Sequence, residues 1–189
     1  MIIGFAGAHG MGKTTVVEAL RARNEFKHFK FKPSPSRELG AQGFTINELG
    51  TEVTQMYIMA KHYEYSRLDG DVILDRCALD GLVYTSVILE GFQDVDFKNA
   101  LGTLGRKCFE RYNIIFYVRP ELELKDDGVR TVDPVFFNKI VDRFKYWTDA
   151  IKFYRNPVPV VELFGSVENR VEQVMHALET RGYTNNVVL

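Results

Sequence analysis

The sequence of 189 residues has only two cysteines and no long apolar run. Cys77 and Cys108 are far apart without paired spacing, which argues against a disulfide framework and favours a reducing compartment. Apolar stretches such as residues 83–89 are interrupted by polar residues, whereas a membrane-spanning helix needs about 20 apolar residues. The four histidines show no zinc-ligand spacing. We therefore expect a soluble, cytoplasmic protein without a membrane segment or structural metal.

An excess of charge of either sign is also lacking, since the formal net charge is −1. Such a chain has no broad electropositive field for binding duplex nucleic acid, so we expect no nucleic-acid partner. Its 46% hydrophobic residues supply a core and exclude disorder. At this length we expect a single domain over residues 1–189. Residues 1–5 contain neither a basic segment nor a cleavage site, so we expect them to belong to the fold.

Strand-like and helical patterns alternate along the chain. Strand-like patterns cover residues 2–6, 28–32, 71–75, 113–118 and 158–161. Helical spacing of apolar residues covers 14–20, 46–63, 97–108, 134–154 and 167–178, with N-caps expected at Thr45, Asp133 and Ser166. Apolar strands separated by helices indicate an α/β fold with a mostly parallel sheet covered on both faces. Ligands of such sheets bind at the carboxyl ends of the strands.

A phosphate-binding motif carries the strongest functional signal. Residues 7–14 match G-x-x-x-x-G-K-T and lie between the first predicted strand and the first predicted helix. Backbone N–H groups of such a loop converge on phosphate oxygens, Lys13 reaches the β- and γ-phosphates, and Thr14 holds Mg²⁺. We expect His9 to shape the loop. The candidate nucleotide-binding residues are Gly7, His9, Gly10, Met11, Gly12, Lys13, Thr14 and Thr15.

A second motif follows the third predicted strand, where Asp75 is followed directly by Arg76. An aspartate at this position can hold Mg²⁺ through water or accept a hydroxyl proton, and the arginine can neutralise phosphate charge. A surface ion pair is the alternative interpretation. The sequence has no N-K-x-D motif and no acidic pair after an apolar strand, which weakens the GTPase and motor-ATPase interpretations.

With these motifs, the sequence resembles the P-loop nucleoside and nucleotide kinase group. The likeness is to thymidylate-kinase-like and phage deoxynucleoside-monophosphate-kinase-like proteins, with a lid similar to that of nicotinamide riboside kinases. The matching segments are residues 7–14, 36–38, 75–76, 127–130 and 165–166. The resemblance implies a three-layer fold with a mostly parallel five-stranded sheet. It also implies ATP and Mg²⁺ as cofactors and a small-molecule nucleotide or nucleoside as acceptor, and it is compatible with a homodimer.

The resemblance also implies roles for individual residues. Arg37 corresponds to an arginine that holds an acceptor monophosphate, although Leu39-Gly40 replaces the Pro-Gly that follows it in thymidylate kinases. Asp75 and Arg76 match the pair that faces the acceptor and the transferred phosphate. Arg130 matches the arginine of a lid, here expected at about residues 119–133.

Further substrate contacts are expected at the edges of this site. Gly165 and Ser166 follow the last predicted strand and resemble the segment that contacts adenine. Tyr57 and Tyr84 are candidates for stacking on the acceptor base, although aromatics at helical spacing more often belong to a core.

These residues favour transfer of a phosphoryl group from ATP to a (deoxy)nucleoside monophosphate, giving the diphosphate. The expected catalytic residues are Lys13, Asp75, Arg76 and Arg130. One alternative is a nucleoside or riboside kinase in which Asp75 deprotonates a 5′-hydroxyl. Others are a nucleotide-sensing regulator and a kinase acting on a modified base or terminus in DNA. The last would use the basic and aromatic residues 26–32, whose alternation equally fits a strand at a sheet edge.

Replacing Arg130 with alanine tests the expected lid. Because an arginine that stabilises transition-state charge contributes roughly 10³–10⁵ in rate in related chemistry, we expect turnover to fall far more than ATP affinity. Steady-state kinetics together with ATP titration separates the two quantities. An equal loss of both would contradict a lid role.

Overall fold

The computed structural model describes residues 1–121, 133–154 and 156–183, and these form a five-stranded sheet covered by helices. All strand pairs are parallel, in the order β2-β3-β1-β4-β5. The strands are β1 Ile2–Ala6, β2 Lys30–Lys32, β3 Val72–Asp75, β4 Ile114–Val118 and β5 Val160–Leu163. The helices are α1 Lys13–Arg21, α2 Pro35–Ala41, α3 Glu52–Ser66, α4 Ala78–Ile88, α5 Val95–Phe109, α6 Pro134–Ile151 and α7 Val167–Thr180. Short 3₁₀ turns occupy η1 Asn24–Phe26 and η2 Asn47–Leu49. This architecture confirms the predicted three-layer α/β fold.

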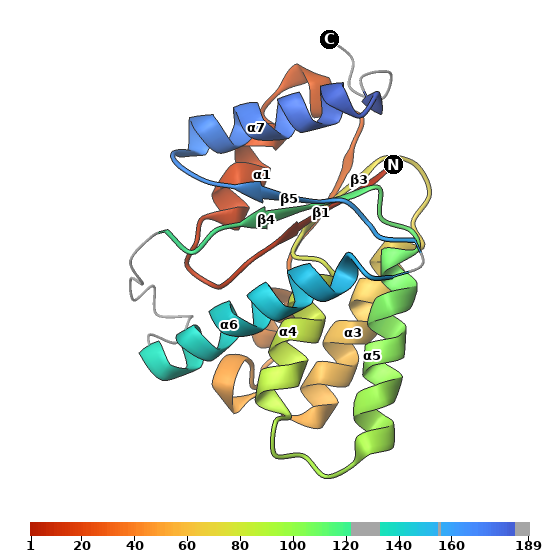
Figure 1. The fold of residues 1–189 in the computed structure, drawn as a ribbon, viewed down its shortest axis with the longest axis vertical. Coiled ribbons are helices and arrows are strands. Elements are labelled where there is room, and N and C mark those ends of the chain that lie inside the picture. The colour runs from red at the N-terminus through yellow and green to blue at the C-terminus, as the bar shows by residue number, and fades with distance from the viewer. Residues whose placement is uncertain (122–132, 155, 184–189) are drawn as a thin grey trace.

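The helices divide between the two faces of the sheet (Figure 1). Helices α1 and α7 lie on one face, and α3, α4, α5 and α6 lie on the other. The inner strands β1, β3 and β4 are buried along their whole length, as parallel strands covered on both faces must be. The edge strands carry charge, with Lys30 on β2 and Glu162 on β5 exposed, which discourages pairing with another sheet.

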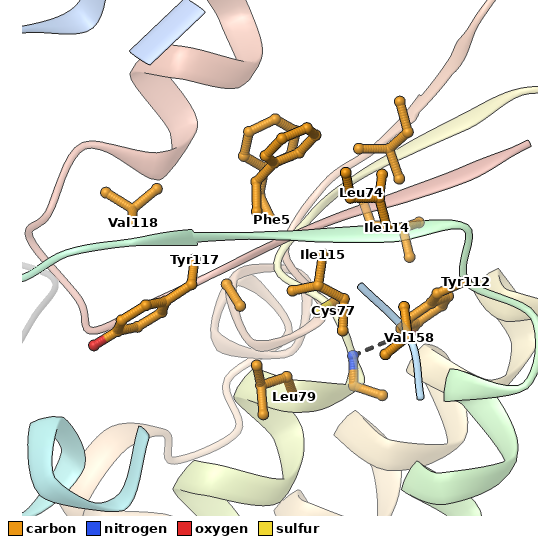
Figure 2. Packing of buried hydrophobic residues seen from close by; sticks show 14 of the residues in the cluster. Phe5, Leu74, Cys77, Leu79, Tyr112, Ile114, Ile115, Tyr117, Val118 and Val158 are labelled. Carbon is orange, nitrogen blue, oxygen red and sulfur yellow. Dashed lines mark hydrogen bonds between the residues drawn. The ribbon is translucent and has the colours of Figure 1, made fainter. Parts of the chain in front are cut away.

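Successive side chains of the inner strands fill the two halves of the core. Figure 2 shows Phe5 and Val118 on one side of the sheet and Ile115 and Tyr117 on the other, as the period of two requires. On the first side the ring of Phe5 lies 5.3 Å from that of Phe116. On the other side the Tyr112 hydroxyl accepts a hydrogen bond of 3.1 Å from the backbone N–H of Ala78 (Figure 2), which anchors the start of α4 against the sheet.

The helix boundaries both confirm and correct the expectations from sequence. The predicted caps Asp133 and Ser166 accept hydrogen bonds from backbone N–H groups in the first turns of α6 and α7. The predicted cap at Thr45 is wrong, because α3 begins after Thr51, whose hydroxyl accepts the N–H of Thr54. Between Thr45 and Thr51, residues 47–49 form η2, and Gly50 in an extended conformation separates this turn from α3.

Two helices were missing from the sequence prediction. Helix α2 begins with Pro35 at its first position, where the missing N–H of proline costs no helical hydrogen bond. Helix α4 is buried on nearly every side, so it lacks the amphipathic spacing by which helices are recognised. Among the described residues, no helix combines the length and apolar character that crossing a bilayer requires. Residues 122–132, which hold Arg130 and most of the expected lid, lie outside the described part of the chain.

Close packing of α4 against α5 predicts a specific response to substitution. A Cβ atom on Gly105 of α5 would lie 2.6 Å from the Leu82 side chain, and such overpacking costs about 1–3 kcal/mol. We therefore expect Gly105→Ala to lower the free energy of unfolding, as measured by urea denaturation. Gly102→Ala on the same helix is the control, because its Cβ would meet only the Arg106 guanidinium at 3.5 Å. Equal stability of the two variants would contradict this packing.

Candidate functional site

The loop that joins β1 to α1 forms a cradle of backbone groups at the carboxyl edge of the sheet. Gly10 and Gly12 adopt positive φ angles of 79° and 81°, which glycine reaches without steric cost. A side chain at Gly7 would lie 2.6 Å from the carbonyl oxygen of Val118 on β4. The glycines of the motif are therefore needed both for the turn and for its close approach to the sheet.

Lys13 closes this loop from its own first helical turn. Its ammonium group donates hydrogen bonds of 2.6 Å to the carbonyl oxygens of Gly7 and Ala8, and its side chain is buried. These two hydrogen bonds compensate part of the cost of burying the ammonium group. The loop therefore offers backbone N–H groups, a helix N-terminus and an ammonium group, a combination suited to phosphate.

Thr14 connects the loop with the end of β3. Its hydroxyl donates a hydrogen bond of 2.8 Å to Oδ2 of Asp75. The pairing of β1 with β3 places Asp75 beside Phe5, only a few residues before the loop, and the Asp75 side chain is almost completely buried. The two residues predicted to hold Mg²⁺ are thus in direct contact.

Arg76 has a strained backbone and a tightly held side chain. Its φ of 77° is in the left-handed region, which non-glycine residues rarely occupy outside functional or strained sites. The guanidinium group pairs with Asp80 at 3.0 Å and lies over the Tyr84 ring, 5.3 Å from its centroid. Burial works against the charge of Arg76, but the electrostatic effect of Tyr84, Asp80 and Asp75 outweighs it and raises the pKa of Arg76.

Asp80 positions Arg76 from the first turn of α4. Its carboxylate also accepts the backbone N–H of Cys77 at 3.3 Å, and a negative charge at a helix N-terminus is favourable. Burial nevertheless raises the pKa of Asp80, against the opposing effect of Arg76. Sequence reasoning missed Asp80, because α4 is buried on nearly every side and shows no amphipathic spacing.

A cavity of about 240 Å³ lies beside the loop. Its lining includes residues 10–15 of the loop together with Ser36, Arg37, Asn47 and Arg76. The cavity therefore brings together the phosphate loop and two predicted acceptor-binding arginines. Arg37 is exposed at its rim, on helix α2.

A narrow extension of about 30 Å³ continues from this cavity toward α3 and α4. Ser36, Asn47 and Arg76 line both spaces, and Tyr84, Gln55 and His62 line the extension. Gln55 and His62 are each 1% exposed, and Oε1 of Gln55 accepts the hydroxyl of Thr85 at 3.1 Å. Nδ1 of His62 has no hydrogen-bond partner among the described residues. Sequence reasoning missed both residues, because the buried face of α3 mixes polar side chains with Ile58 and Met59 and therefore shows no apolar stripe.

The structure does not bring every predicted residue to the cavity. Tyr57 is 50% exposed and packs against Phe44 outside both spaces, so the stacking role expected for it has no support here. Helix α3 begins later than predicted, and its outer face carries this residue. His9 is buried and hydrogen-bonded to the Tyr84 hydroxyl through its backbone N–H at 3.0 Å and its ring Nδ1 at 2.9 Å. These hydrogen bonds connect the loop with Tyr84, which also lines the extension of the cavity.

Gly165 and Ser166 lie apart from the cavity, in the turn between β5 and α7. The Gly165 N–H donates a hydrogen bond of 2.8 Å to the carboxylate of Glu121, which follows β4. The hydroxyl of Ser166 caps α7 by accepting the N–H of Asn169 at 3.2 Å. Both residues are exposed at the carboxyl edge of the sheet, on the flank where β4 and β5 end.

Comparisons with known proteins identify the family and the fold of the chain. A family model described as an AAA domain, AAA_28, matches residues 2–170. The chain belongs to this AAA domain family. The match runs from the first strand into α7 and thus includes the whole carboxyl edge of the sheet.

Solved structures show that this AAA domain has the fold of P-loop kinases. A deoxyadenosine kinase from M. mycoides, with products dCMP and a flexible dCDP bound, superimposes with a TM-score of 0.71 at 14% identity, over 96% of this chain and all of the other. The same enzyme with bound dCTP superimposes with a TM-score of 0.65 at 16% identity, over 95% of this chain and all of the other. The NadR protein in complex with NR superimposes with a TM-score of 0.67 at 16% identity, over all of this chain and 51% of NadR. A search of curated proteins found no match.

The buried His62 predicts how stability depends on pH. Burial, with a smaller effect of the Arg76 charge, lowers the pKa of His62 from 6.5 to about 3. Below pH 6.5 the imidazole takes up a proton in the unfolded chain but not in the folded chain. The free energy of unfolding is therefore highest above pH 6.5 and falls as the pH is lowered toward 3. His62→Leu removes this group, so the difference in unfolding free energy between wild type and variant should change by up to about 1.4 kcal/mol per pH unit below about pH 6.

Urea denaturation at a series of pH values between about 7.5 and 5 measures this difference. The variant His176→Leu controls for loss of a histidine, because His176 is exposed on α7. A difference between wild type and His62→Leu that stays constant over this range would contradict the burial of a neutral imidazole.

Proposed function

We propose that this AAA domain is an ATP- and Mg²⁺-dependent kinase that transfers a phosphoryl group to a (deoxy)nucleoside monophosphate. The observation that carries the proposal is that residues 10–15 of the phosphate loop, Arg37 and Arg76 line the same cavity. The loop is suited to the donor phosphates, and the two arginines present cations to an acceptor. Phosphoryl transfer depends mainly on such positioning and on neutralisation of charge.

On the donor side, the loop N–H groups and the start of α1 would hold the β- and γ-phosphates. Lys13, which donates to the Gly7 and Ala8 carbonyls, would exchange these neutral acceptors for phosphate oxygens. A charge-assisted hydrogen bond to phosphate is stronger than one to a neutral carbonyl. The exchange therefore favours nucleotide binding without displacement of the backbone.

The contact between Thr14 and Asp75 fits a magnesium ion. Both side chains offer oxygen ligands, which Mg²⁺ prefers, and their oxygens lie 2.8 Å apart in a largely buried position. Thr14 would hold the ion directly, and Asp75 would hold it through water. When bound with ATP, Mg²⁺ supplies neutralisation of charge on the phosphate oxygens.

On the acceptor side, Arg37 and Arg76 differ in their electrostatic state. The charge of Arg76 is balanced by Asp80, whereas Arg37 makes no ion pair with any of the described residues and stands at the rim. An acceptor phosphate would supply the missing counter-charge to Arg37. An oxygen of this phosphate attacks the γ-phosphorus, the bond to the bridging oxygen of ADP breaks, and ADP leaves with the electron pair.

A nucleoside or riboside kinase is the second candidate, and the similarity in fold to a deoxyadenosine kinase and to NadR with bound NR favours it. An acceptor hydroxyl must lose its proton during transfer, and Asp75 would take it. In the structure this carboxylate already accepts the hydroxyl of Thr14. That contact fits a metal partner better than a free base, which supports the monophosphate as acceptor.

Radiolabelled ATP with a panel of nucleosides and nucleoside monophosphates tests the proposal. We expect label on at least one monophosphate, giving the diphosphate, and loss of at least about a hundredfold in turnover for Lys13→Ala and Asp75→Asn, because both act on developing charge. Lys27→Ala removes an exposed lysine elsewhere and should leave activity intact. Label on nucleosides but on no monophosphate would reject the first candidate in favour of the second.

Arg37→Ala separates the two acceptor classes within the active enzyme. Loss of a charge-assisted hydrogen bond should raise the KM for the monophosphate roughly tenfold to a hundredfold, with little change in the KM for ATP. Arg111→Ala is the matched control, because Arg111 is an exposed arginine remote from the cavity. An unchanged monophosphate KM in Arg37→Ala would contradict the role of Arg37.

A further inference from the structure

Arg170 occupies an electrostatically unfavourable position in the first turn of α7. Its side chain is 2% exposed and is the largest of the fully buried side chains. Burying a charge is costly, and a cation near a helix N-terminus is repelled by the helix dipole. Stability of α7 therefore gives no reason for an arginine at this position.

The contacts of Arg170 point instead to the phosphate loop. Nη1 donates a hydrogen bond of 2.8 Å to the carbonyl oxygen of Met11. Met11 is itself fully buried and belongs to the wall of the main cavity. Helices α1 and α7, which lie side by side on one face of the sheet (Figure 1), bring the two residues together.

By holding the carbonyl group of Met11, this hydrogen bond also fixes the direction of the N–H of Gly12. The peptide bonds of the described chain are trans, and in a planar trans peptide the C=O of one residue and the N–H of the next point in opposite directions. Holding the Met11 oxygen on the side of α7 therefore turns the N–H of Gly12 to the opposite side. Gly12 has φ of 81° and no side chain to restrain it, so this plane would otherwise rotate readily.

A second contact connects Arg170 with the ends of β4 and β5. Nη2 lies 3.7 Å from Oε2 of Glu121, and the same oxygen accepts the N–H of Gly165 at 2.8 Å. Nε and Nη2 have no hydrogen-bond partner among the described residues. The guanidinium group is thus held by one hydrogen bond to the loop and by attraction to a single carboxylate.

We propose that Arg170 is a positioning residue for the donor phosphates, which orients the Met11–Gly12 peptide so that the Gly12 N–H faces the bound triphosphate. This inference rests on the proposed function, because it assumes that the loop binds ATP. Helix α7, which lies outside the phosphate motif, would thus help to set the affinity of the loop for phosphate.

Calorimetric titration of Arg170→Met with MgATP and with inorganic tripolyphosphate tests this role. Methionine keeps the apolar length of the side chain but cannot donate a hydrogen bond. We expect the Kd to rise about tenfold or more, equally for both ligands, because the lost interaction acts on the phosphates. Arg170→Lys retains a charged donor and should recover part of the affinity.

Val174→Ala is the matched control for simple destabilisation. Val174 is fully buried one turn further along α7 and has no polar contact with the loop. Circular dichroism establishes that every variant is folded at the temperature of titration. If Arg170→Met binds both ligands as well as Val174→Ala does, or loses affinity for ATP but not for tripolyphosphate, the inference is wrong while the proposed function stands. A wild type that binds no MgATP would overturn both.

Discussion

The parallel pairing of β1 with β3 is the constraint on which the site depends. It sets Phe5 beside Asp75, so that the loop after one strand and the charged pair after the other emerge at the same edge of the sheet. A slip of the register by one residue would turn every side chain of the strand to the opposite face. The buried apolar residues on both faces of β1 and β3 therefore also fix the distance between Thr14 and Asp75.

Buried charges gather at this edge, and each is balanced in a different way. Lys13 is held by loop carbonyls, Arg76 by Asp80, and Arg170 by the Met11 carbonyl with Glu121 nearby. Such groups cost free energy when they are buried, so a fold retains them most readily where a charged ligand completes their surroundings. This shared property makes the carboxyl edge of the sheet suited to an anionic ligand.

Sequence reasoning succeeded where the signal was local. The glycine-rich motif, the caps Asp133 and Ser166, and the apolar strands were all predicted, because each depends on residues a few positions apart. It failed for α4, which is buried on nearly all sides, and for the start of α3, where a capping-box spacing at Thr45 competed with the true cap at Thr51. Tyr57 lies outside both spaces, and helical spacing alone does not say which face of α3 meets the site.

The sequence by itself determined the α/β class, the parallel sheet and the identity of the phosphate loop, since the period of the apolar residues and the conformational needs of glycine act within short segments. Only the tertiary structure decided that Gln55, His62 and Asp80 line one space with Arg76, and that Arg170 reaches Met11 from the far end of the chain. These contacts join residues distant in sequence, and their geometry follows from how helices pack on the sheet. No pattern within a single segment encodes that packing.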